Sequence, residues 1–286
     1  MSTIEKALAK QKLTVQKNQL NAIDNTPVVQ NKEQQAILKD TDNLNTNQIL
    51  LDEKRLIEQG FIYGKDSSHY IQEEFRHIKR KLLANAYGPA SKTLNNSNLI
   101  MVTSSKANEG KTFVSINLAL SIALEQDKTV LLIDADVLRP SLHRELQFEN
   151  NKGLLEYLLS EVSDLSEIIY STSIDNLKII PAGKPHHLTN ELLASERMAQ
   201  LAYELAKRYP DRMVIFDCPP ILGVTETPVL STLVGQAVIV VEESKTKLED
   251  VKKASQQLNE EIALGFVMNK TIKSKKDEYG YYGYDK

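Results

Sequence analysis

The sequence predicts an α/β domain on a mostly parallel sheet, with helices on both faces and a flexible tail at each end. From about residue 66, short apolar runs typical of buried strands alternate with longer segments of helical spacing. The chain has 286 residues, more than one average domain, and its 41% of apolar residues suffice for a large core. We therefore expect three parts: residues 1–65, a core domain at 66–272 and a tail at 273–286.

The composition excludes several classes of protein. With 35 basic and 38 acidic residues the net charge is −3, so we expect no nucleic-acid partner. The single cysteine, Cys218, rules out an internal disulfide framework, and the five histidines show no metal-ligand spacing. No apolar run approaches the roughly 18 residues of a membrane span. The first residues contain no apolar signal region, so we expect a cytoplasmic protein.

The N-terminal part is polar. Residues 1–50 contain seven Asn and seven Gln, with no aromatic residue and no glycine. Such a segment buries too little apolar surface to offset its ordering entropy, which predicts a flexible tether at about 12–50. The first ten residues differ, because Ser2 and Glu5 fit a capping box and Ile4, Ala7 and Leu8 share one helical face. Two interpretations stay open there: a frayed end, and a short helix that docks on a partner.

The core domain follows from its periodicity, taken in chain order. Helical spacing predicts helices at about 68–86, 111–126, 141–147, 153–160 and 190–208. Apolar runs predict strands at 99–102, 129–133, 177–180, 213–216, 237–241 and 263–268. These strands are apolar on both faces, which is typical of a parallel sheet covered by helices on both sides. The polar, glycine-bearing residues 273–286 are expected to be disordered.

The first chemical signal is the segment from Ser105 to Thr112, which lies directly between a predicted strand and a predicted helix. This is the context that a phosphate-binding loop requires. Backbone amides at the helix start would surround the phosphates, Lys111 would bind the β- and γ-phosphates, and the Thr112 hydroxyl would ligate Mg²⁺. Ser105 replaces the first glycine of the GxxxxGK[ST] pattern, so the motif is degenerate, and a chance turn is the alternative.

Two further signals are acidic residues at strand ends. Asp134 and Asp136 end one apolar strand, and residues two apart on an extended segment point the same way. The alternative is that they cap the following helix. Asp217 ends another strand, just before Pro219 and Pro220, where a carboxylate usually helps to hold Mg²⁺ in phosphate-loop enzymes. The three signals in this order predict a P-loop NTPase-like fold that binds ATP and Mg²⁺.

The fourth signal is a tyrosine cluster at the end of the chain. Four of the eleven tyrosines lie in the last eight residues: Tyr279, Tyr281, Tyr282 and Tyr284. Glycines and lysines beside them disfavour any regular element. Tyrosines on a flexible segment beside acids are good phosphoacceptors, because the chain can enter an active site. The alternative is an aromatic end that folds onto a partner.

Taken together, these motifs resemble those of a known family. GKT at 110–112, DADVLRP at 134–140, FDCPP at 216–220 and the tyrosine cluster resemble the bacterial tyrosine kinases of capsule and exopolysaccharide synthesis, over about residues 66–286. The stretches at 2–8, 74–85 and 191–198 and the YGYYGY end resemble one branch, the exosortase-associated tyrosine autokinases. In that branch the kinase is a separate soluble chain. It acts beside a membrane protein that governs polysaccharide chain length.

The resemblance implies an enzyme, a transferase that uses ATP and Mg²⁺ to phosphorylate its own tyrosine cluster in trans and so regulates exopolysaccharide or capsule synthesis and export. It implies Lys111, Asp134 and Asp136 as catalytic residues, with Asp134 the candidate base and Asp136 the alternative. The implied metal ligands are Thr112, Asp136 and Asp217. The implied nucleotide-binding residues are Asn108, Glu109, Gly110, Lys111, Thr112, Phe113 and, beside adenine, Asn269.

The resemblance also implies an assembly. Glu73, Arg76 and Lys79, with Arg80 adjacent, match an ExxRxxR element that docks one protomer on the next, although a solvated helix face is the alternative. The implied partners are further copies of the chain in a ring that dissociates on phosphorylation, a membrane chain-length-determinant protein as activator, and a cognate tyrosine phosphatase. The protein would then be peripheral to the inner face of the membrane through its partner.

The sequence departs from the family at several positions. Lys79 replaces the last arginine of the docking element, Leu138 stands where an arginine is usual, and Ser105 and Asn108 lack the usual loop glycines and proline.

Two other functions compete with the kinase. Partitioning and septum-positioning ATPases share the order of motifs, and Lys106 stands where their signature lysine does, but that class has no tyrosine tail. The second is a non-catalytic ATP-binding adaptor, against which the intact Lys111, Thr112 and strand-end acids argue.

Overall fold

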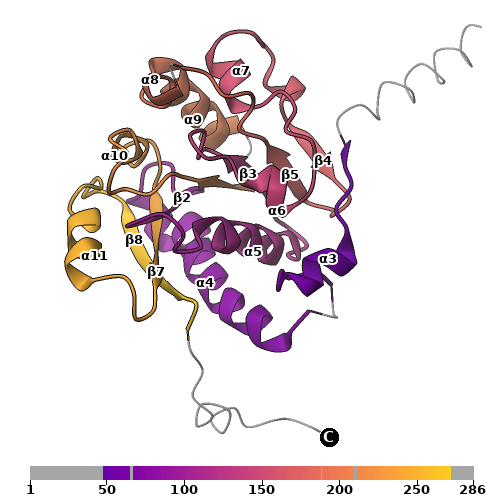
Figure 1. The fold of residues 1–286 in the computed structure, drawn as a ribbon, viewed down its shortest axis with the longest axis vertical. Coiled ribbons are helices and arrows are strands. Elements are labelled where there is room, and N and C mark those ends of the chain that lie inside the picture. Colours follow the sequence, from indigo (N-terminus) through magenta and orange to yellow (C-terminus); the bar gives the residue numbers. More distant parts are fainter. Residues whose placement is uncertain (1–47, 65–66, 188, 209–210, 272–286) are drawn as a thin grey trace, which may run out of the picture. The chain divides into compact units, whose positions relative to one another are not determined.

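The computed structural model describes residues 48–64, 67–187, 189–208 and 211–271, which lie in one compact unit of residues 47–286. Within these residues the sheet has eight strands in the order β1-β4-β5-β3-β6-β2-β7-β8 (Figure 1). The predicted N-terminal helix, most of the predicted tether and the tyrosine cluster lie outside the described residues. The strands are β1 Gln48–Ile49, β2 Leu99–Ser104, β3 Thr129–Asp134, β4 Tyr170–Thr172, β5 Leu177–Ile180, β6 Arg212–Asp217, β7 Gln236–Glu242 and β8 Ala263–Asn269.

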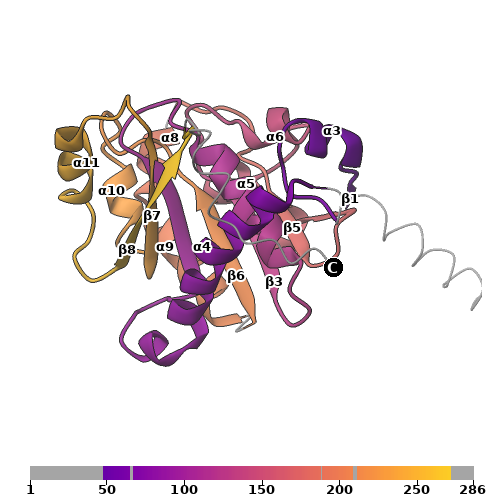
Figure 2. The same ribbon diagram turned by 90° about the horizontal axis from the view of Figure 1, so that it is seen from below.

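The sheet is mostly parallel, as predicted. Taken in the order of the sheet, the six neighbouring strands β5, β3, β6, β2, β7 and β8 run parallel to one another. Strand β4 is antiparallel to β5. The short β1 pairs with β4 at the edge opposite β8 (Figure 2). In the pairing of β3 with β6, Asp134 lies directly across from Asp217. The strand ends that carry the predicted acids are therefore neighbours.

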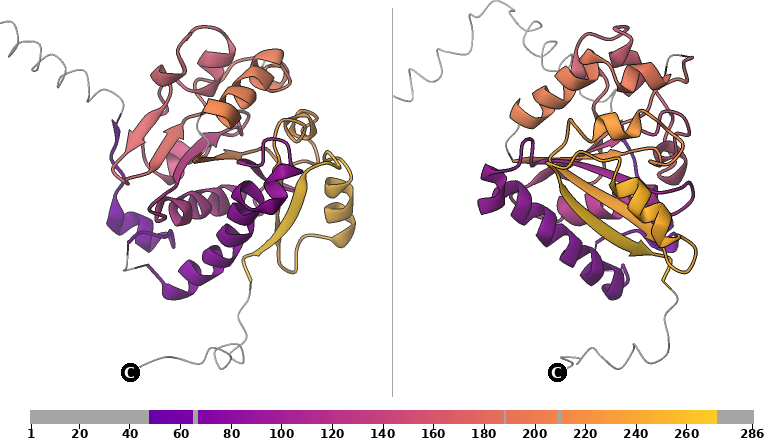
Figure 3. Two further views of the ribbon diagram at one scale, coloured as in Figure 1. Left: turned by 180° about the vertical axis from the view of Figure 1, so that it is seen from behind. Right: turned by 90° about the vertical axis from the view of Figure 1, so that its left-hand side faces the viewer.

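Helices cover both faces of the sheet (Figures 1 and 3). One core cluster includes Ile100 and Val102 of β2 with residues of α3 to α6, and the other includes Leu99 and Met101 with residues of α7 to α11. Alternate β2 side chains thus enter opposite layers, as the two-residue period of a strand requires. The helices are α3 Glu53–Glu58, α4 His69–Tyr87, α5 Lys111–Ala123, α6 Leu142–Glu145, α7 Leu154–Leu158, α8 Thr189–Leu193, α9 Glu196–Arg208, α10 Thr227–Leu230 and α11 Leu248–Ser255.

One helix predicted from the sequence forms two helices in the structure. The segment predicted as a helix at 190–208 forms α8 and α9, which are separated at Ala194 and Ser195. The Ser195 hydroxyl accepts a hydrogen bond from the Met198 amide at 3.2 Å, which caps the start of α9. Because the apolar spacing continues through both helices, the sequence did not predict this break. Within the described residues, no helix is both long enough and apolar enough to cross a membrane.

The domain boundary predicted at residue 66 is wrong. The compact unit begins at residue 47, and β1 and α3 precede the predicted start. Leu56, Phe61 and Ile62 are buried against the layer that contains α5. The Ile62 amide also donates to Asn117 Oδ1 of α5 at 2.8 Å. The few apolar residues in this segment follow neither a strand period nor a helix period, so their burial left no pattern to find.

Candidate functional site

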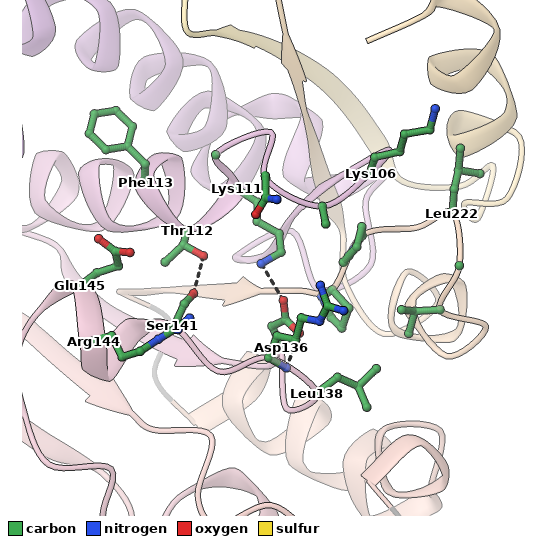
Figure 4. Close-up of a pocket in the computed structure, with 18 of the residues that line it drawn as sticks. Lys106, Lys111, Thr112, Phe113, Asp136, Leu138, Ser141, Arg144, Glu145 and Leu222 are labelled. Carbon is green, nitrogen blue, oxygen red and sulfur yellow. Dashed lines mark hydrogen bonds and ion pairs between the residues drawn. The ribbon is translucent and has the colours of Figure 1, made fainter. Parts of the chain in front are cut away.

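The first three chemical signals meet at the carboxyl ends of the central strands. Strands β3, β6 and β2 are adjacent, and the segments that follow them surround a cavity of about 720 Å³ (Figure 4). The phosphate loop and the start of α5 line it, together with residues of the segments after β3 and β6 and Lys270 after β8. Ligands of open α/β sheets bind in this position.

The phosphate loop is held by side chains rather than by the usual glycines. The buried Glu109 carboxylate accepts hydrogen bonds from the Lys106 amide at 2.9 Å and from the Thr246 hydroxyl at 2.5 Å. Lys270 Nζ donates to the Asn108 carbonyl at 2.7 Å. These contacts attach the loop to the ends of β7 and β8 and offset the missing glycines.

Gly110 is the one loop position where a glycine is required. Its φ of 94° lies in the left-handed region, and a Cβ there would overlap the Asn269 side-chain amide. That amide donates to the Glu109 carbonyl at 2.9 Å. Asn269, expected beside adenine, therefore also fixes the loop. Phe113 and Asn108 line the cavity, whereas the Glu109 carboxylate is taken up by the Lys106 amide and the Thr246 hydroxyl.

Lys111 and Asp136 both line the cavity and form an ion pair with each other. Lys111 Nζ lies 2.7 Å from Asp136 Oδ2, and both side chains are nearly buried (Figure 4). Burial lowers the pKa of the Lys111 ammonium, but the charges of Asp217 and Asp136 more than offset this, so its pKa lies above the usual value. Lys111 therefore carries a full positive charge at the start of α5, where phosphates are expected to bind.

The Thr112 hydroxyl connects two sides of the site. It donates to Asp217 Oδ2 at 2.7 Å and lies 2.7 Å from the Ser141 hydroxyl. Ser115 Oγ donates to the other Asp217 oxygen at 3.1 Å. Burial raises the pKa of the Asp217 carboxyl, although the charge of Lys111 and the Thr112 hydroxyl oppose the shift. Asp217 is thus fixed in place by two hydroxyls of α5.

The two acids at the end of β3, Asp134 and Asp136, differ in environment. Asp134 Oδ2 accepts hydrogen bonds from the Ser141 and Leu142 amides, each at 3.1 Å, so Asp134 caps the start of α6. Its Oδ1 is buried without a hydrogen-bond partner among the described residues. Burial and the charge of Asp217 raise its pKa well above the usual value. Asp136, which lies beyond the strand end, lines the cavity instead. The capping alternative therefore holds for Asp134. Both acids still lie near Lys111, since the charges of Asp136 and Asp134 both raise the pKa of its ammonium.

The site suits Mg²⁺. Magnesium prefers oxygen ligands and keeps several waters, and it binds with phosphates through one or two carboxylates. Thr112 Oγ1, Asp217 Oδ2 and the unpartnered Asp134 Oδ1 supply oxygens of this kind. The described residues hold no group of three or more His, Cys, Asp and Glu side chains arranged as a complete metal site.

The residues of the predicted docking element on α4 differ in exposure: some are exposed, and one is buried. Glu73 and Arg76 form an ion pair with each other, and Arg76 and Arg80 are exposed. Lys79 is buried, and its Nζ lies 2.5 Å from Glu125 Oε1 just after α5. The Lys79 ammonium therefore contacts its own chain, and only the arginines and Glu73 remain for a neighbour.

Some site residues have no signal in the sequence. Ser141 contacts Thr112 across 29 positions and Thr246 contacts Glu109 across 137, so no local pattern reveals them. Lys106 is paired with Asp250 of α11 at 2.6 Å. Lys106, which stands at the signature-lysine position of the competing ATPases, thus forms an ion pair within its own chain.

The chain is similar to proteins of known name. Residues 97–281 match the AAA domain family. The tyrosine-protein kinase YwqD of Bacillus subtilis is 38% identical over 186 residues, 64% of this chain and 77% of that protein. The putative tyrosine-protein kinase CapB of Staphylococcus aureus is 31% identical over 231 residues, 80% of this chain and 96% of that protein.

Solved structures agree with these matches. The chimerical protein CapA2B2 has a TM-score of 0.64 at 25% identity, covering 82% of this chain and 99% of that one. The septum site-determining protein MinD of Pyrococcus horikoshii, complexed with Mg-ADP, has a TM-score of 0.51 at 24% identity. The match covers 62% of this chain and 72% of that one. At this identity it shows only that the two proteins share the P-loop NTPase fold. Because similarity to the two named kinases extends over most of their length, the chain belongs to the bacterial tyrosine-protein kinase family.

Proposed function

We propose that the protein is an ATP-dependent tyrosine kinase that phosphorylates the C-terminal tyrosine cluster of another copy of itself. One observation carries the proposal. Lys111 and Thr112, at the start of a helix that follows a phosphate loop, contact the carboxylates of Asp136 and the buried Asp217, and Lys111, Thr112 and Asp136 line one cavity. Positioned positive charge beside metal-binding carboxylates is the equipment that phosphoryl transfer needs.

Each part of the site has a role in binding ATP. The backbone amides at the start of α5 bind the phosphates, and Lys111 turns from Asp136 to the β- and γ-phosphates. Mg²⁺ held through Thr112 and Asp217 would neutralise charge on the same phosphates. Asn269, at the end of β8, would lie beside adenine.

The transfer requires little covalent chemistry from the protein. The tyrosine phenol oxygen forms a bond to the γ-phosphorus, and the bond from that phosphorus to the β–γ bridging oxygen breaks, which releases ADP. A phenol has a pKa near 10, so a carboxylate beside it assists loss of its proton. We assign this carboxylate to Asp136, because it lines the cavity and is freed when Lys111 binds phosphate. Asp134 would instead position α6.

Transfer in trans requires an assembly. We propose that Glu73, Arg76 and Arg80 contact the next copy in a ring, and that phosphorylation dissociates it. Each phosphotyrosine adds roughly −1.5 to −2 charges, so four add about −6 to −8 beside acids of the same tail. The modified tail would be repelled by Asp136 and Asp217 at contact range. Changing the four tyrosines to Phe should keep the assembly intact with Mg·ATP, whereas a fully phosphorylated sample that sediments as the same oligomer would contradict this cycle.

The cellular setting completes the proposal. A membrane chain-length-determinant protein would activate the kinase at the inner face of the membrane, a tyrosine phosphatase would reverse its action, and the cycle would regulate polysaccharide synthesis and export. The similarity to named tyrosine-protein kinases and the resemblance of the motifs to those of the kinases of capsule and exopolysaccharide synthesis support this setting. Membership of the exosortase-associated branch stays a prediction.

The experiment is a product analysis. Purified protein is incubated with Mg·ATP, and phosphotyrosine is mapped by mass spectrometry while ADP is measured. The proposal expects phosphate on the C-terminal tyrosines and its loss in Lys111→Met. An ATPase of the septum-positioning type would give ADP without phosphotyrosine, and an adaptor would give neither.

A further inference from the structure

One wall of the cavity is apolar although the site binds charged groups. Leu138, in the segment between β3 and α6, has an exposed fraction of 44% and lines the cavity with Pro220, Leu222 and Val224. Leu138 and Val224 belong to neither core cluster of the described residues, and Leu222 is only partly packed on one. The fold therefore gives Leu138 no packing role, and its side chain faces the space where a ligand would lie.

The position of this wall relative to the phosphate loop matters. Figure 4 shows Thr112 and Phe113 on one side of Asp136, and Leu138 and Leu222 on the other. Lys111, Thr112 and the following helix start would hold the β- and γ-phosphates. An in-line transfer brings the acceptor to the γ-phosphate from the side opposite the leaving oxygen. The apolar wall lies beyond Asp136 from the helix start, so with the phosphates bound at that helix start an acceptor would approach from this part of the cavity.

We propose that Leu138, Pro220, Leu222 and Val224 form the subsite for the ring of the acceptor tyrosine, contributed by the tail of a second copy. This inference rests on the proposed kinase function. A tyrosine ring buries a large apolar surface and carries its hydroxyl at the far end. When the ring packs on this wall, its hydroxyl extends toward Asp136, whereas a serine or threonine is too short and too polar to do both.

The surroundings of the wall fit the same occupant. Arg139, next to Leu138, is exposed and lines the cavity. The tyrosine cluster is flanked by Asp277, Glu278 and Asp285. An arginine at the rim attracts acids that flank the acceptor, which favours one register of the tail. The apolar wall and the rim charge therefore select acid-flanked tyrosines.

The test uses the full chain with its four tail tyrosines changed to Phe, so that it phosphorylates only an added peptide of residues 275–286. Leu138→Ala and Leu222→Ala are each introduced. Removing methyl groups from an apolar subsite should raise the peptide KM about tenfold, while affinity for ADP stays unchanged. Leu138→Met should have the peptide KM of the chain with Leu138, because methionine supplies the apolar surface that alanine lacks. Leu124→Ala, an exposed leucine at the far end of α5, is the matched control and should keep the unmodified KM.

A second peptide tests the ring itself. The same sequence with serine in place of each tyrosine should give no phosphopeptide with any variant. An unmodified peptide KM in both alanine variants overturns the subsite and leaves the kinase standing. Absence of phosphotyrosine from the unaltered chain overturns the kinase function and the subsite together. The exposed Leu138 leaves the thermal midpoint of Leu138→Ala unchanged, so its KM reports binding and not unfolding.

Discussion

The segment before α4 should be part of the stable core, and Phe61 tests this directly. Phe61 is 2% exposed, and its ring lies 5.4 Å from the ring of Phe113 at an interplanar angle of 31°. Replacing a buried phenylalanine by alanine costs about 3–5 kcal/mol in lost burial and cavity formation. We therefore expect Phe61→Ala to lower the free energy of unfolding by at least about 3 kcal/mol, a large part of the 5–15 kcal/mol typical of a domain.

The assay is urea unfolding followed by circular dichroism, with ADP affinity measured under folding conditions. Leu50→Ala is the matched control, because Leu50 lies in the same segment and is 75% exposed. Its free energy of unfolding should change by less than about 0.5 kcal/mol. Phe113 directly follows Thr112, so Phe61→Ala should also weaken ADP binding. A change below about 1 kcal/mol for Phe61→Ala would refute the reasoning, since a fully buried aromatic side chain costs more than that.

Three other variants test the site and the assembly. Gly110→Ala should weaken ADP binding at least tenfold by calorimetry, since alanine disfavours a φ of 94° and its Cβ overlaps Asn269; unchanged affinity would contradict the loop geometry. Asp217→Asn should raise the Mg²⁺ concentration needed for activity and lower the maximum rate, and an identical Mg²⁺ titration would argue against its metal role. Arg76→Ala with Arg80→Ala should convert the unphosphorylated oligomer to monomers in light scattering, whereas an identical mass would indicate a solvated surface.

The central sheet and the position of the site could be predicted from the sequence. Strands buried on both faces give continuous apolar runs, and the strand predicted at 213–216 lies within β6, which is buried throughout. The loop was predicted because it directly follows such a strand, and Asp134 and Asp217 because they end two others, whereas Asn269 was expected beside adenine only from the family resemblance. Parallel strands bring their carboxyl ends to one edge, so the order of the motifs predicted that they meet.

What could not be predicted depends on contacts between distant residues. The burial of Phe61 and Ile62 requires the surface of α5, which lies about fifty positions later. Lys79 reads as a surface cation on a helix, yet it is buried beside Glu125. Asp134 caps α6 through the amides of Ser141 and Leu142, seven and eight positions later, and the spacing of the two acids does not reveal these contacts.

The measurement that tests the account most directly mixes two variant chains. One is Lys111→Met with its tail tyrosines intact, and the other has an intact site with Tyr279, Tyr281, Tyr282 and Tyr284 changed to Phe. Neither chain should gain phosphotyrosine alone with Mg·ATP. The account predicts that the mixture gains phosphotyrosine on the tail of the Lys111→Met chain, mapped by mass spectrometry. A mixture in which no tyrosine is phosphorylated, under conditions where the unmodified chain phosphorylates itself, would contradict transfer between copies.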